Sequence, residues 1–164
     1  MNSTRVLSIA QIYENHAEHL KLTWVAAEGV DRDVELADQE VFGPDVVGHF
    51  NLIYGHRIQV IGNAEWRWID KVGQAHWRHQ LEMMMAAEPP AIIIADDYEP
   101  SEMIRSLCEA HRIPLFSTPK PCSMVIDYLH LYLAREFADT ISVHGVFMDV
   151  YGIVVLITGD AGIG

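Results

Sequence analysis

The residues with the clearest potential for chemistry form a glycine-rich segment, residues 159–164, with the sequence GDAGIG. Gly159 and Gly164 have the spacing of the first two glycines in the phosphate-binding motif G-x-x-x-x-G-K-[ST], and the β-branched stretch 153–158 precedes them as that motif requires. Glycines at these positions let backbone N–H groups turn toward a bound phosphate. The pattern therefore indicates a phosphate-binding loop, and a plain glycine-rich tail is the alternative.

One histidine is placed beside this loop by the turn that precedes it. Residues 151–152 (YG) are typical of a two-residue hairpin turn, because the glycine accepts a positive φ. If Val150 pairs with Ile153, the register continues to His144 opposite Gly159. A single histidine in a strand is usually structural, but this position makes His144 a candidate catalytic residue.

Two further sets of polar residues have spacings that could form a site. Asp96 and Asp97 follow the apolar run 91–95, at what should be the carboxyl end of a buried strand, where open α/β sheets bind ligands. A turn that caps a helix is the favoured interpretation of this pair. His76 and His79 share a helix face at a spacing suited to a metal, yet no third ligand stands nearby in the sequence, so a metal site there is disfavoured.

Large and sulfur-containing side chains favour packing over ligand binding. Trp66, Trp68 and Trp77 could stack on a base or a sugar, but core or interface packing is the favoured role for them. Cys108 and Cys122 are too few for a disulfide framework, and we expect two free, partly buried thiols.

Periodicity predicts the elements that must position these residues. Expected helices span 9–19, 63–87 with a break near Gly73, 101–111 and 123–137, and expected strands span 22–26, 57–62, 91–95 and 114–116. The acidic tract 29–42 is expected to be a loop containing one helical turn. Alternating strands and helices predict an α/β fold with a mostly parallel sheet flanked by helices. The change of pattern at residues 138–139 predicts a domain boundary, with one domain at 1–138 and the beginning of another at 139–164.

Composition limits the class of partner. The 164 residues carry a formal net charge of −12, which argues against binding nucleic acid or an anionic membrane surface through bulk electrostatics. The longest clean apolar run, 153–157, is too short to span a bilayer. We expect a cytoplasmic protein.

The segment HGVFMDVYGIVVLITGDAGIG (144–164) closely resembles the start of the catalytic domain of HPr kinase/phosphorylase, which has an HGVFMDVYG-like strand, an apolar strand and a GDSGIGKS-type loop. Earlier stretches also fit the family in the right order: residues 22–26, 47–53 against a GYLNLIHPNR tract, 57–62, 90–95 and 114–116. The resemblance covers essentially the whole chain.

The resemblance implies a bifunctional enzyme with a P-loop kinase domain that the hairpin opens. It would use ATP and Mg²⁺ to phosphorylate a serine of the phosphocarrier protein HPr, or of a nitrogen-branch paralogue, in regulation of sugar phosphotransferase systems. It would also remove that phosphate by phosphorolysis with inorganic phosphate, releasing pyrophosphate. Family members are typically homohexamers.

By the same resemblance, His144 maps onto an active-site histidine. The nucleotide-binding segment maps onto Gly159, Asp160, Ala161, Gly162, Ile163 and Gly164. Ala161 stands where many members have serine. The loop lysine, the metal-binding residues and the catalytic aspartate of the family map beyond Gly164. We therefore expect a polypeptide of these 164 residues to be an inactive fragment. The alternative is a stand-alone regulatory or oligomerisation module without catalysis.

Overall fold

The computed structural model describes residues 6–35, 45–137, 145–150 and 153–158. Its centre is a five-stranded sheet in the order β2-β7-β6-β5-β4, formed by β2 (Thr23–Ala26), β4 (Val47–His49), β5 (Ile58–Ile61), β6 (Ile92–Ile94) and β7 (Leu115–Ser117). The four strands β4 to β7 are mutually parallel, and β2 joins the β7 edge in antiparallel orientation. The predicted mostly parallel α/β sheet is confirmed.

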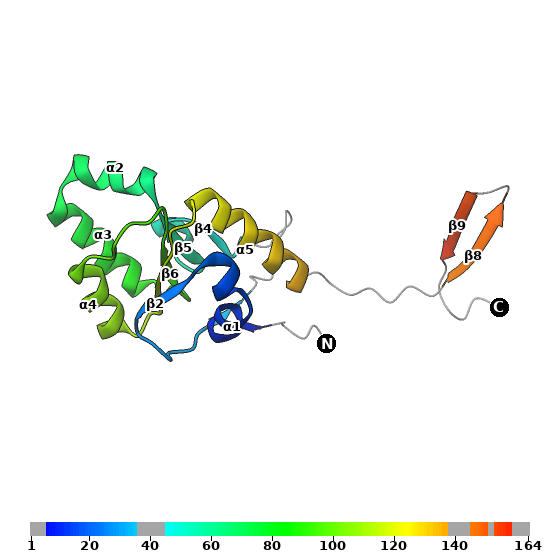
Figure 1. Ribbon diagram of the computed structural model, residues 1–164, viewed down its shortest axis with the longest axis horizontal. Helices are drawn as coiled ribbons and strands as arrows, with labels where there is room; N and C mark the ends of the chain where they lie inside the picture. The colour runs from blue at the N-terminus through cyan, green and yellow to red at the C-terminus, as the bar shows by residue number, and fades with distance from the viewer. Residues whose placement is uncertain (1–5, 36–44, 138–144, 151–152, 159–164) are drawn as a thin grey trace.

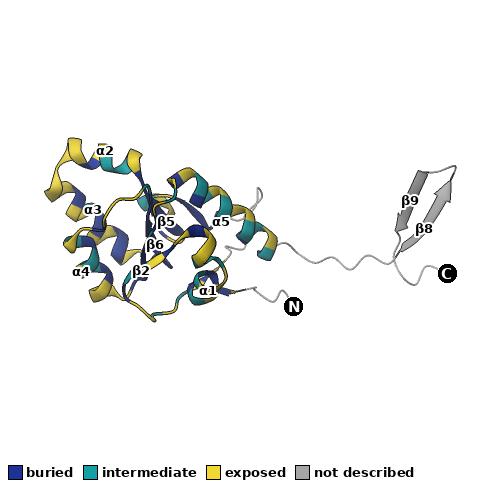
Figure 2. Ribbon diagram, viewed as in Figure 1, coloured by how far each residue is buried: buried dark blue, intermediate teal, exposed yellow. Residues whose placement is uncertain are grey.

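Helices cover both faces of this sheet (Figure 1). Helices α1 (Ile9–Leu20) and α5 (Cys122–Phe137) share one core with side chains such as Val60 and Phe116. Helices α2 (Asn63–Val72), α3 (Gln74–Ala86) and α4 (Glu102–His111) share a second core that contains Ile61 and Leu115. The inner strands β5, β6 and β7 are therefore largely buried between two helical layers, whereas the helices expose their outer faces (Figure 2).

Local sequence signals set the ends of the helices. The Ser8 side chain accepts the backbone N–H of Gln11, and the Gln11 side-chain oxygen accepts the backbone N–H of Ser8. The two bonds make a complete capping box for α1. At the start of α4, the Ser101 side chain accepts the amide N–H of Ile104, a single capping bond. The break at Gly73 between α2 and α3 is confirmed, and Gly73 adopts a positive φ of 87° there.

Strand β5 is buried on both faces, although its sequence IQVI includes the polar residue Gln59. All four residues are buried, including Gln59, because helices pack on both faces of the sheet. The Gln59 amide donates to the carbonyls of Tyr54 and Arg57 and accepts the amide N–H of Asn51. This buried side chain thus anchors the short 3₁₀ turn η1 (Leu52–Tyr54), which lies between β4 and β5.

The structure contains short strands before β5 that the periodicity does not predict. The described part of the tract 29–42 holds a short strand, β3 (Asp33–Val34), paired with β1 (Leu7–Ser8). Residues 36–42 lie outside the described residues, so the expected helical turn in this tract stays a prediction. The periodicity also missed β4, whose three residues centre on a glycine and are too short to show a period.

The C-terminal hairpin consists of β8 (Gly145–Val150) and β9 (Ile153–Thr158). The expected pairing of Val150 with Ile153 is confirmed, and the ladder continues to Gly145 opposite Thr158. The hairpin forms its own two-stranded sheet. Among the described residues, every helix is too short or too polar to cross a membrane.

Candidate functional site

The carboxyl ends of the parallel strands gather several polar groups at one edge of the sheet. Asp96 follows β6, and its carboxylate accepts two backbone N–H groups, from Asn63 at 2.8 Å and from Cys122 at 3.0 Å. These are the first residues of α2 and α5. One carboxylate therefore caps two helices on opposite faces of the sheet, where the positive ends of the helix dipoles favour negative charge.

Gly62 makes this close approach possible. A Cβ atom at this position would lie 2.5 Å from the Asp96 Oδ2 atom and 2.6 Å from the Cys122 Cβ atom. The φ of Gly62 is −138°, so the requirement for glycine here comes from crowding and not from backbone conformation. Asp96 and Asp97 have φ values of 58° and 62°, the left-handed region that aspartate tolerates better than most residues.

Three ligand-type side chains meet at the same edge. The His49 Nδ1 atom lies 2.8 Å from Glu65 Oε1 and 3.7 Å from Cys122 Sγ, and the three ligand atoms all lie within 4.8 Å of one another. The residues come from the end of β4, the first turn of α2 and the start of α5. The other carboxylate oxygen of Glu65 accepts the Gly62 amide N–H at 2.8 Å, which fixes this side chain.

The charges around the thiol of Cys122 are negative. Burial, and to a smaller extent the nearby carboxylates of Glu65 and Asp96, together raise the pKa of the Cys122 thiol to about 12. Burial likewise raises the pKa of Cys108 to about 12, with a smaller contribution from Glu109. Both cysteines are free, as expected, but they are buried and not partly buried. With pKa values of about 12, both are neutral thiols at neutral pH.

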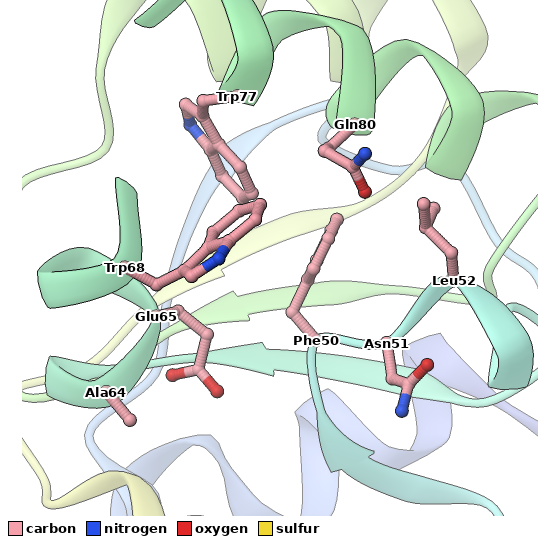
Figure 3. A pocket seen from close by; sticks show the side chains of 8 residues that line it. All are labelled: Phe50, Asn51, Leu52, Ala64, Glu65, Trp68, Trp77 and Gln80. Atoms are coloured by element: carbon pink, nitrogen blue, oxygen red, sulfur yellow. The ribbon is translucent and has the colours of Figure 1, made fainter. Parts of the chain in front are cut away.

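An aromatic pocket of about 390 Å³ adjoins this cluster through Glu65. Trp68 and Trp77 lie on one side of it and Phe50 on the other, while the Glu65 carboxylate points away from the indole rings (Figure 3). The remaining lining residues are Asn51, Leu52, Ala64 and Gln80. Trp77 is buried in the second core, as predicted, whereas the Trp68 side chain is part of the surface. The aromatic walls of this pocket can stack on a planar or apolar ligand.

Some of the site residues predicted from the sequence lie outside the part of the chain that the structure describes. His144 and the loop residues Gly159, Asp160, Ala161, Gly162, Ile163 and Gly164 lie outside the described residues, and so does the pairing of His144 with Gly159. The last described pair of the hairpin, Gly145 with Thr158, is next to them in sequence.

The remaining candidates can be placed. Asp96 caps a helix, which confirms for this residue the favoured interpretation of the pair Asp96 and Asp97. His76 and His79 are both exposed, and His76 packs edge-on against Trp68. Within the described part of the chain, the single group of three ligand-type residues close enough to hold a metal is His49, Glu65 and Cys122.

Sequence reasoning missed this group. Glu65 and Cys122 lie 16 and 73 positions after His49 in the sequence. Glu65 has a local signal, since it stands three residues after the cap position Gly62. No short-range pattern links His49 or Cys122 to it, because three separate elements bring them together.

Comparison with known proteins points to a single family. Residues 7–133 match the family model described as HPr Serine kinase N terminus. A protein from Azoarcus sp. (strain BH72) named HPr kinase/phosphorylase is 44% identical over 160 residues, covering 98% of this chain and 51% of that protein. Proteins of the same name from Aromatoleum aromaticum and Ralstonia pickettii are 42% and 41% identical, covering 51% and 49% of those proteins. The chain thus spans about half the length of the curated relatives it matches.

Among solved structures, a similar one contains the CBS and DRTGG domains of the regulatory region of Clostridium perfringens pyrophosphatase, complexed with the activator diadenosine tetraphosphate. The TM-score is 0.45 at 16% identity, and the similarity covers 72% of this chain and 45% of that chain.

Proposed function

This chain belongs to the family of HPr serine kinase N-terminal domains, and from that membership we propose that it is part of a kinase that acts on the phosphocarrier protein HPr. The observation that carries the proposal is the similarity at 44% identity to a protein named HPr kinase/phosphorylase, over nearly the whole chain. The proposed reaction transfers phosphate from ATP to a serine of HPr or a paralogue. In a second proposed reaction, inorganic phosphate would attack the serine phosphate, so that the phosphoryl group passes to it to form pyrophosphate and the serine hydroxyl is regenerated.

We propose different roles for the two parts of the chain. Residues 1–138 form a non-catalytic domain, and residues 139–164 begin the kinase domain. The backbone amides of the loop 159–164 would hold the phosphates of ATP. His144 would act in the active site, against the transferring phosphate or against the catalytic carboxylate. We further propose a cytoplasmic location and a homo-oligomer, a hexamer as the resemblance implies.

Mg²⁺ would supply charge stabilisation at the β- and γ-phosphates. No residue of the loop 159–164 other than Asp160 carries a charged side chain, so its contribution is backbone positioning. The loop lysine and the metal-binding residues of the family map beyond Gly164, so they would have to come from sequence that follows.

The alternative is that the α/β domain acts by itself as a regulatory or oligomerisation module. The aromatic pocket between Phe50 and Trp68 supports a binding role for this domain, because all of its lining residues belong to the α/β domain and none to the hairpin. A binding role is compatible with the kinase proposal if the domain and the kinase belong to one protein.

The coding sequence beyond codon 164 provides the first test. Lysine followed by serine or threonine supports the kinase, and a stop codon supports the module. The second test is an assay of the purified proteins with HPr, ATP and Mg²⁺, read out as serine phosphate on HPr. We expect transfer by a protein of the relatives' length and none by the 164-residue polypeptide, which has no lysine in its loop.

Transfer to HPr by the 164-residue polypeptide would overturn the fragment interpretation. Absence of transfer by the longer protein, with HPr shown to be folded, would overturn the proposed function itself.

A further inference from the structure

We propose that His49, Glu65 and Cys122 form a zinc-binding site in the α/β domain. The proposal does not depend on the kinase assignment, because all three residues lie on the domain that precedes the hairpin. The ligand chemistry is one imidazole nitrogen, one carboxylate oxygen and one sulfur.

The spacing of the ligand atoms fits a small tetrahedral cation. Zinc bonds of about 2.0–2.1 Å to nitrogen and about 2.3 Å to sulfur at a tetrahedral angle place the two ligand atoms about 3.6 Å apart. The His49 Nδ1 atom and the Cys122 Sγ atom are 3.7 Å apart. The contact of 2.8 Å between His49 and Glu65 is that of a hydrogen bond, and it requires a small movement to admit a metal. A hydrogen bond alone explains the contact between His49 and Glu65, but not the approach of the Cys122 thiol to the same point.

The set of donors selects the class of metal. A sulfur and an imidazole nitrogen suit zinc and related transition metals, whereas Mg²⁺ prefers oxygen ligands. The residue Cys122 is 6% exposed, and the His49 side chain is 55% exposed. Three protein ligands with one exposed side leave room for a water or a small ligand as the fourth, as in exchangeable zinc sites.

The surrounding groups hold the ligands in place before a metal arrives. Glu65 is fixed by its bond to the Gly62 amide, and this uses only the carboxylate oxygen that does not face His49. Asp96 joins the first residues of the two helices that carry Glu65 and Cys122. The carboxylates of Glu65 and Asp96 also give this edge the negative charge that a divalent cation would neutralise.

The site would lie next to the aromatic pocket, because Glu65 borders both. Zinc would join β4, α2 and α5, the three elements that supply its ligands. A metal that binds only the folded state raises the melting temperature. We therefore expect Zn²⁺ to stabilise the domain.

Titration of the reduced chain with Co²⁺ and then Zn²⁺ tests the proposal. We expect one Co²⁺ per chain, with a thiolate-to-cobalt charge-transfer band in the near ultraviolet, strong visible absorption of a four-coordinate ion, and displacement by Zn²⁺. Cys122→Ser should abolish the charge-transfer band. Cys122→Ser and His49→Ala should each weaken Zn²⁺ binding at least about 100-fold, since even residues that only orient a ligand commonly contribute about 10–100-fold. Glu65→Gln should weaken it while keeping the cap to Gly62.

Matched controls are Cys108→Ala, a buried thiol in the other core, and His79→Ala, an exposed histidine on α3. Both should bind like the wild type. Because His49 is exposed, its replacement tests the site even if a Cys122 variant fails to fold. The proposal is overturned if the wild type shows no thiolate band, or if His49→Ala binds Zn²⁺ as tightly as the wild type. Loss of binding in His79→Ala alone would place the metal elsewhere and overturn it as well.

Discussion

At the scale of single residues, the carboxylate of Asp96 caps two helices at once. Its two carboxylate oxygens accept N–H groups from Asn63 and Cys122, one at the beginning of each of two helices. A capping side chain contributes about 1 kcal/mol, and a buried donor left without a partner costs about 1–3 kcal/mol. The residue after the buried strand therefore determines how α2 and α5 meet the sheet.

Asp96→Asn should lower the free energy of unfolding by roughly 1–2 kcal/mol, because an amide offers one oxygen acceptor where the carboxylate offers two. Asparagine also tolerates the left-handed backbone of this position, so the loss reports on the capping bonds. The measurement is urea unfolding, and the control is Asp97→Asn, at an exposed neighbour with the same backbone region. Equal stability of the two variants would contradict the capping role.

At the scale of elements, α1 and α5 meet through a group of rings. The His16 Nδ1 atom lies 2.8 Å from the Tyr128 hydroxyl, and the His16 ring lies 4.0 Å from the Tyr132 ring, centroid to centroid. The His16 Nε2 atom is buried without a hydrogen-bond partner in the structure. Burial, and to a smaller extent the charge of His19, lower the pKa of His16, while Glu136 opposes them. The folded state therefore favours the neutral imidazole.

This contact predicts a pH dependence of stability. Since the folded pKa lies below the ordinary value of 6.5, the contribution of His16 is fully present above that value. It is lost as the pH falls through 6.5 toward the lowered pKa, because the unfolded chain then binds more protons.

Thermal unfolding at about pH 7.5 and about pH 5.5, on either side of the ordinary histidine range, measures the effect. His16→Gln keeps a partner for Tyr128 and should show a smaller loss of stability between the two conditions than the wild type. The exposed His79→Gln serves as the control and should behave like the wild type. A pH response of His16→Gln equal to that of the wild type would show that His16 does not carry it.

At the scale of the whole molecule, the chain joins an α/β domain to a hairpin whose register the sequence specifies. The pairing of Gly145 with Thr158 is the step before His144 and Gly159 in the same ladder. If the ladder continues by one pair, His144 stands beside the first glycine of the loop. The proposed catalytic role of this histidine rests on that step and on the family resemblance.

In a protein of the relatives' length, His144→Ala should reduce phosphoryl transfer to HPr by about 100-fold or more, within the range typical of acid–base and positioning residues. The melting temperature should change little. Transfer rate and melting temperature are measured on the same preparation, with His144→Gln as a variant that keeps a polar side chain of similar reach. Parallel losses of activity and stability would make His144 a structural residue.

Local patterns in the sequence determined the helices with their caps, the buried strand β6 (Ile92–Ile94), the break at Gly73 and the hairpin register. These features depend on contacts between residues a few positions apart, which a sequence displays directly. The tertiary structure alone decided that Gln59 is buried and that His49, Glu65 and Cys122 meet. Burial of Gln59 requires helices on both faces of the sheet, and the cluster requires β4, α2 and α5 to end at one edge. Such contacts arise from packing between distant segments, and no local period encodes them.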